Sequence, residues 1–113
     1  MAYLLLAECR VTTGRMQDFT AQVQQWEQDA LRHPDAPRHH AVYLSSDDPA
    51  SVLIITEFES RDAANRFAAD GVLAAFRDAV LPCVDAMPAE RDGYDLFYSA
   101  TPAGPSVTFG QAT

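Results

Sequence analysis

The chain has 113 residues, of which 48% are hydrophobic and 21% charged, a composition typical of one globular domain. Its formal net charge of −8 argues against nucleic-acid binding, because the neutralisation of phosphates requires clustered cations. All eight basic residues are arginines, and the lack of lysine excludes Schiff-base catalysis, pyridoxal phosphate attachment and a P-loop.

The first apolar stretch predicts a buried strand from Tyr3 to Val11. One face of this strand is purely apolar, and the other mixes leucines with Glu8 and Arg10. A signal peptide is the alternative for residues 1–7, but the stretch lacks a basic start and the two charges interrupt it early. No apolar run approaches the roughly 20 residues that span a bilayer. We therefore expect a cytoplasmic protein that does not enter a membrane.

A turn at residues 12–14 precedes a predicted helix. Its apolar residues are spaced by three and four positions: Met16, Phe19, Val23, Trp26 and Ala30. The positions between them, including Gln24 and Glu27, are interpreted as a solvated face. Trp26 at this spacing is interpreted as a core anchor first and as a ligand contact second.

Two strands are predicted after a loop that is bounded by prolines. The first covers His39 to Ser45. Residues 46–50 supply the turn of a hairpin into the second strand, Val52 to Phe58. This second strand is apolar at most positions on both faces, so we expect it to be central in its sheet.

A second helix is predicted to begin near Arg61, where Ser60 accepts a hydrogen bond from a free amide of the first turn. The helix is expected to break at Gly71, to resume over residues 72–81 and to stop at Pro82. Arg66 lies on this helix four residues after an aspartate, at the spacing of an ordinary surface ion pair.

A last strand is predicted from Tyr94 to Ala100. The order β-α-β-β-α-β is that of the ferredoxin-like split βαβ fold, an α+β class with an antiparallel sheet and helices on one face only. The other face is left for a partner, so we expect a homodimer. We divide the chain into a domain over residues 1–100 and a C-terminal extension over residues 101–113 that is expected to be flexible.

The histidines are the main candidates for chemistry. His39 and His40 are adjacent on a strand and point to opposite faces, so they do not share one ion, and we predict no metal site. Either residue is a candidate general base, because histidine titrates near neutrality. The alternative is a hydrogen-bonded strand histidine with a structural role. Cys9 and Cys83 form no metal or redox motif and are interpreted as buried thiols.

Three segments of the chain resemble the antibiotic biosynthesis monooxygenase domain family, whose members are dimeric α+β barrels. They are residues 12–19 (TTGRMQDF), residues 36–40 (APRHH) and residues 56–63 (TEFESRDA), the last similar to the family's W-E-S-x-x-A. The resemblance extends over about residues 3 to 100. It implies that two protomers pack sheet against sheet, with a pocket inside each protomer between the helices and the sheet.

The family includes cofactor-free oxygenases of aromatic polyketides, quinol monooxygenases, heme-degrading enzymes and members with no known activity. The polyketide oxygenases carry an Asn and a Trp on the third strand, where this chain has Ile54 and Phe58. The heme-degrading members carry a Trp and an axial His on the second helix, where this chain has Phe67 and Phe76. Any activity of this chain is therefore expected to use other groups of the pocket.

The resemblance implies a small homodimeric enzyme that oxygenates an aromatic or polyketide-like hydrophobic substrate without a cofactor. A base would form a phenolate or enolate that itself reduces oxygen. The residues expected to act as base or as partner of the anion are His39, His40, Tyr43 and Arg66. The residues expected to contact the substrate are Trp26, Ile54, Phe58, Asn65, Phe67 and Phe76. The alternatives are a polyketide cyclase of the same fold, a non-catalytic ligand-binding or accessory protein, and a heme-binding remnant.

Overall fold

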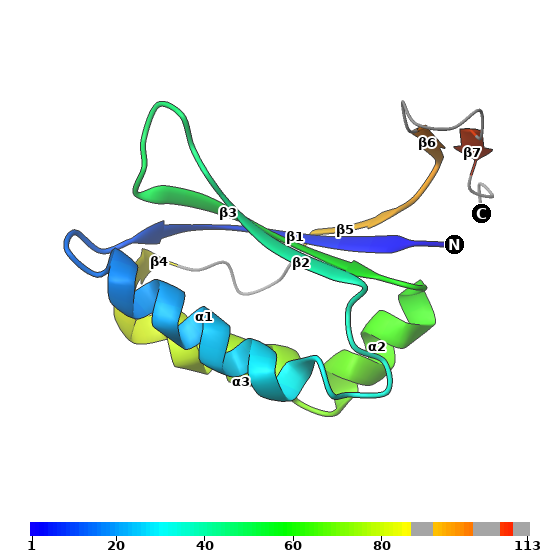
Figure 1. The fold of residues 1–113 in the computed structure, drawn as a ribbon, viewed down its shortest axis with the longest axis horizontal. Coiled ribbons are helices and arrows are strands. Elements are labelled where there is room, and N and C mark those ends of the chain that lie inside the picture. Colours follow the sequence, from blue (N-terminus) through cyan, green and yellow to red (C-terminus); the bar gives the residue numbers. More distant parts are fainter. Residues whose placement is uncertain (87–91, 101–106, 110–113) are drawn as a thin grey trace.

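The structure, a computed structural model, describes residues 1–86, 92–100 and 107–109. Its main element is a five-stranded antiparallel sheet with three helices on a single face (Figure 1). The strands of this sheet are β1 (Tyr3–Val11), β2 (His39–Leu44), β3 (Ser51–Phe58), β4 (Val84–Ala86) and β5 (Asp92–Asp95). The helices are α1 (Met16–Ala30), α2 (Arg61–Ala69) and α3 (Val72–Val80), and a 3₁₀ turn, η1 (Leu81–Cys83), follows α3.

The sheet has the strand order of the ferredoxin-like fold. Strand β3 lies between β2 and β1, and both β4 and β5 pair with the remaining edge of β1. β4 pairs at Arg10 and Val11, and β5 pairs along residues 3–6. Each of these pairings is antiparallel. The predicted α+β class, the split βαβ topology and the central position of Val52–Phe58 are therefore confirmed.

The last strand differs from the prediction of Tyr94–Ala100. The segment that pairs with β1 is Asp92–Asp95, whereas β6 (Tyr98–Ala100) pairs with β7 (Val107–Phe109) in a separate two-stranded sheet. Gly93 lies opposite Leu5, and a β-carbon at this position would collide with the hydroxyl group of Tyr3. A glycine therefore allows this close approach, and pairing begins earlier than the apolar pattern indicated.

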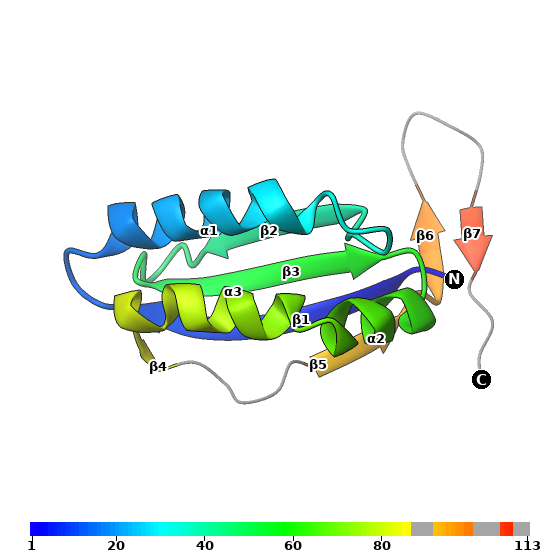
Figure 2. The same ribbon diagram turned by 90° about the horizontal axis from the view of Figure 1, so that it is seen from below.

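The helical layer follows the sequence signals closely. The Ser60 hydroxyl oxygen accepts a hydrogen bond from the Ala63 N–H at 3.1 Å, which caps α2 as predicted. Gly71 separates α2 from α3 with a φ of 80°, a left-handed conformation that glycine adopts without a steric penalty. Seen from the helical side, α1 runs along β2, and α2 and α3 run along the β1 side (Figure 2). None of the helices in the described part of the chain is long and apolar enough to cross a membrane.

The core lies between the helices and the helix-facing side of the sheet. Alternation along β3 places Val52, Ile54, Thr56 and Phe58 in this core. Helices α2 and α3 add Phe67 and Phe76, which are fully buried, and α1 adds Trp26. The indole N–H of Trp26 donates a hydrogen bond to the Val72 carbonyl oxygen at 2.9 Å, so the buried polar atom of this anchor is satisfied.

The opposite face of the sheet carries no helix in the described part of the chain (Figure 1). Strands β1 and β3 place Leu4, Leu6, Leu53 and Ile55 on it, because these residues alternate with the core residues. On β2 the same alternation adds Tyr43, which is 54% exposed. We call this surface the open sheet face. Its row of partly exposed aliphatic side chains is typical of a surface that another molecule covers.

Candidate functional site

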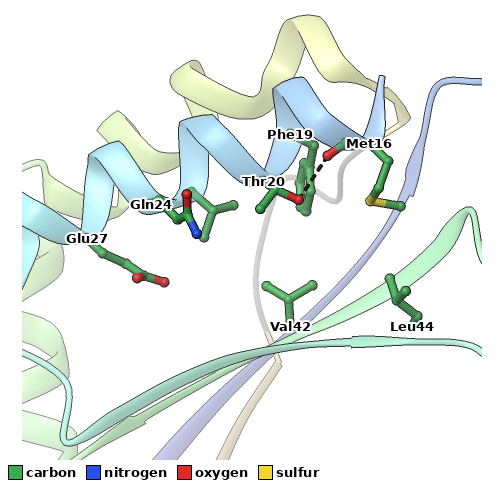
Figure 3. Close-up of a pocket in the computed structure, with 8 residues that line it drawn as sticks. Met16, Phe19, Thr20, Gln24, Glu27, Val42 and Leu44 are labelled. Carbon is green, nitrogen blue, oxygen red and sulfur yellow. Dashed lines mark hydrogen bonds between the residues drawn. The ribbon is translucent and has the colours of Figure 1, made fainter. Parts of the chain in front are cut away.

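A groove of about 380 Å³ lies between α1 and the edge strand β2 (Figure 3). Its apolar walls come from helical spacing on α1 and from alternation on β2. The lining residues are Met16, Phe19, Thr20, Val23, Gln24, Glu27, Val42 and Leu44. Glu27 lies toward one end of the groove, and Met16 and Leu44 lie at the other (Figure 3). A mostly apolar groove with a few polar groups is the usual form of a small-molecule site.

Glu27 forms a pair with His40 behind the wall of this groove. The His40 Nδ1 and the Glu27 Oε1 are 3.0 Å apart, within hydrogen-bond distance. The side chain of His40 is only 4% exposed, whereas that of Glu27 is 32% exposed and lines the groove. The carboxylate is therefore the member of the pair that a bound molecule would meet, and the imidazole holds it from behind.

Aromatic rings fix the His40 imidazole in place. Its ring centroid lies 5.1 Å from that of Trp26 and 5.7 Å from that of Phe76. Rotation of the imidazole would disturb two core side chains, so its hydrogen bond to Glu27 is held by packing. An imidazole and a carboxylate in hydrogen-bond contact can accept a proton and share it, which is the behaviour expected of a general base.

The other predicted catalytic residues are not brought to this groove. His39 and Tyr43 lie on the open sheet face, because they alternate with His40 along β2. Arg66 is exposed on α2 and donates two hydrogen bonds to Asp35, at 3.0 and 2.8 Å. These hydrogen bonds lower the pKa of the Asp35 carboxyl and raise the pKa of Arg66, so both groups remain charged at neutral pH. The partner of Arg66 is thus the loop before β2.

The predicted substrate contacts are found in two places. Asn65 is exposed on the surface of α2. The five remaining residues are buried together in the core and do not line the groove: Trp26, Ile54, Phe58, Phe67 and Phe76. The ring of Phe67 packs against those of Phe58 and Trp26 at centroid distances of 5.2 and 6.2 Å, respectively. These rings fill the centre between helices and sheet, and the space for a ligand lies to one side, along α1.

Two polar residues of the groove, Gln24 and Glu27, were assigned to the solvated face of the first helix. The helical spacing contained a signal for Glu27, because it follows Val23 by four residues and precedes Ala30 by three. Val23 and Ala30 are both buried in the core. Glu27 therefore lies at the border of the apolar face, where a charged side chain can reach a cavity.

A second histidine–carboxylate contact has a structural role. The His33 Nε2 lies 2.6 Å from an Asp70 oxygen, and the Asp35 N–H donates to the His33 Nδ1 at 3.0 Å. Both ring nitrogens are used, and the contact joins the loop after α1 to the turn between α2 and α3. Cys9 and Cys83 are both buried, as interpreted from the sequence. No group of three residues among those described is arranged to hold a metal ion.

Comparisons with known proteins agree with this fold. The family model described as antibiotic biosynthesis monooxygenase matches residues 2–80. A search of curated proteins finds no match. Among solved structures, SnoaB, a cofactor-independent oxygenase from Streptomyces nogalater, is 15% identical with a TM-score of 0.70, and the match covers 89% of this chain and 97% of that one.

Two further solved structures are similar. Rv0793 from Mycobacterium tuberculosis is 13% identical with a TM-score of 0.69, and the match covers 89% of this chain and all of that one. A protein from Bordetella bronchiseptica is 21% identical with a TM-score of 0.69, with 83% of this chain and 95% of that one covered. At these identities the likenesses show a shared fold.

Proposed function

Since the chain belongs to the antibiotic biosynthesis monooxygenase family, we propose that it is a small homodimeric enzyme that oxygenates an aromatic or polyketide-like hydrophobic substrate without a cofactor. The observation that carries the proposal is the Glu27–His40 pair at one end of an apolar groove. The similarity in fold to a cofactor-independent oxygenase supports it. A cytoplasmic location remains a prediction from the sequence.

The proposed reaction begins with removal of a proton from an acidic C–H of an electron-rich ring system. The Glu27 carboxylate accepts the proton and shares it with His40. The resulting carbanion supplies the electrons that reduce oxygen: a C–O bond forms to give a peroxide anion, which takes up a proton. Loss of the second C–H proton, with cleavage of the O–O bond and release of water, leaves a carbonyl group. One CH₂ and one O₂ thus become one C=O and one H₂O.

The groove offers a partner for the developing negative charge. Tyr43 and Arg66 were expected in this role. Tyr43 lies on the open sheet face, however, and Arg66 is paired with Asp35. The side-chain amide of Gln24 lines the groove one helical turn before Glu27, and its N–H group can donate to a phenolate or enolate oxygen. We assign this stabilising contact to Gln24.

The function is tested with a tricyclic anthrone, whose CH₂ group is acidified by the ring system and its ketone. Incubation of the protein with this probe under ¹⁸O₂ is expected to give a quinone that contains one labelled oxygen, as measured by mass spectrometry, faster than the probe oxidises alone. Label incorporation at the uncatalysed rate across a panel of anthrones and naphthols would reject the oxygenase. A ring-closed product from a linear polyketide in a parallel incubation under nitrogen would instead support the cyclase.

The proposed homodimer is tested on the open sheet face with Ile55→Asp. Ile55 lies between Leu6 and Ala41, near the middle of that face. In a dimer an aspartate there would be buried without a partner, so we expect the dimer dissociation constant to rise more than about 100-fold, an effect of about 3 kcal/mol or more. Light scattering at micromolar concentration measures the change from dimer to monomer.

The matched control for this variant is Leu31→Asp. Leu31 is 53% exposed beyond the end of α1, far from the open sheet face, and the substitution adds the same charge. It should leave the dimer intact, and circular dichroism should show that both variants are folded. A monomeric parent protein at the same concentration would contradict the proposal.

A further inference from the structure

A second cavity of about 250 Å³ lies next to the apolar end of the groove. Met16 and Leu44 line both cavities, so these two side chains lie at the boundary between them. The second cavity extends under the turn before α1 and the end of the β2–β3 hairpin, where its walls include Val11, Thr13 and Ala50. A ligand that fills only the first cavity would stop at Met16.

The polarity of the combined space is graded along its length. Glu27 and Gln24 provide hydrogen-bonding groups at one end, while Val42, Met16 and Leu44 provide apolar contacts toward the junction. A carboxylate would be repelled by Glu27 in a chain of net charge −8. A hydroxyl group can donate to the Glu27 carboxylate, and an uncharged chain gains by leaving water along the apolar walls.

We propose that the two cavities form one elongated substrate site, in which a hydroxylated aromatic head lies against Glu27 and Gln24 and an apolar substituent passes Met16 and Leu44 into the second cavity. The substrate class is thus an uncharged phenol or polyketide with an alkyl or acyl arm, bound head first. The inference rests on the proposed function in one respect: Glu27 is taken to face the end of the substrate that reacts. Met16 and Leu44 act as specificity-determining residues, since the arm must pass between them.

The test compares two probes, 4-ethylphenol and 4-hexylphenol, by isothermal titration under nitrogen. Each buried methylene is expected to tighten binding about fourfold, so the hexyl probe should bind on the order of 100-fold more tightly than the ethyl probe. The hexyl probe should also shift the ¹³C-methyl NMR signal of Met16. This signal is assigned by its absence from the spectrum of the Met16→Leu variant.

Two variants block only the second cavity. Ala50→Phe and Thr13→Trp place a large side chain in it without touching the first cavity. Both should reduce the advantage of the hexyl probe to less than about fivefold and leave the affinity for the ethyl probe within about twofold. Ala74→Phe, on the exposed face of α3, is the matched control and should keep the full advantage. Circular dichroism identifies any variant that fails to fold.

The inference is overturned if the two probes bind the parent protein equally, or if the advantage of the hexyl probe survives both blocking variants. Because binding is measured without oxygen, its outcome is independent of turnover. Dependence on chain length without label incorporation from ¹⁸O₂ would uphold the elongated site and reject the oxygenase. Label incorporation without dependence on chain length would uphold the oxygenase and reject the elongated site.

Discussion

Glu27→Gln is expected to lower kcat for oxygenation of the anthrone by about 10²–10⁴-fold, the usual contribution of a general base. Glutamine has the size of glutamate and can still hydrogen-bond to the His40 Nδ1, so the groove keeps its shape. It cannot accept a proton, so the substrate carbanion would have to form by transfer to water. Oxygen consumption at saturating substrate measures the effect, and KM should change little because substrate binding depends mainly on the apolar walls.

Asp29→Asn is the matched control for Glu27→Gln. It removes the same charge from the same helix, but Asp29 is exposed and does not line the groove. Its kcat should stay within about twofold of the parent value. His40→Gln tests the positioning role of the imidazole: kcat should fall while KM is preserved. If Glu27→Gln retained activity within about threefold, the assignment of the base would be wrong.

Phe67→Ala is expected to lower the free energy of unfolding by about 3–5 kcal/mol, the range for a large aromatic residue removed from a core. The side chain is fully buried, and its ring contacts Phe58 and Trp26 as well as His33, whose ring centroid is 5.2 Å away. Truncation would leave a cavity between α1, α2 and β3, where these rings meet. Urea unfolding at a fixed protein concentration measures the loss, since dimerisation would couple stability to concentration.

Two variants define the specificity of this effect. Phe67→Leu keeps most of the volume and should cost less than about 2 kcal/mol. Leu31→Ala removes an exposed apolar side chain and should change the free energy of unfolding by less than about 0.5 kcal/mol. A loss below about 1.5 kcal/mol for Phe67→Ala would show that the aromatic cluster is less tightly packed than the ring distances indicate.

Local patterns were sufficient to predict most of the fold. The alternation in β3, the cap at Ser60 and the break at Gly71 are effects of a few neighbouring residues, and the structure has all three. The last strand was misplaced because its pairing depends on Gly93 meeting Tyr3, a contact between distant parts of the chain. The division at residue 100 stays a prediction, since residues 101–106 and 110–113 lie outside the described part of the chain.

The candidate site was predictable only in part. Alternation on a strand correctly placed His39 and His40 on opposite faces, but it could not say which of them met a carboxylate. The partner, Glu27, lies thirteen residues earlier on another element, so the pair exists only through the packing of α1 on β2. Phe58, Phe67 and Phe76 were expected to contact the substrate, whereas the structure buries them in the core. The position of the groove could not be predicted, because it depends on side-chain volumes and the spacing of apolar residues gives no information about them.

The packing of Trp26 has a spectroscopic consequence. It is the single tryptophan of the chain, it is buried, and its ring lies against the imidazole that holds Glu27. Its indole emission therefore comes from one environment, with no second fluorophore of this kind to obscure it. Protonation of His40 or displacement of the pair by a ligand changes the charge and contacts beside that indole. The intrinsic fluorescence of the unlabelled protein thus provides an optical reporter placed next to the proposed base.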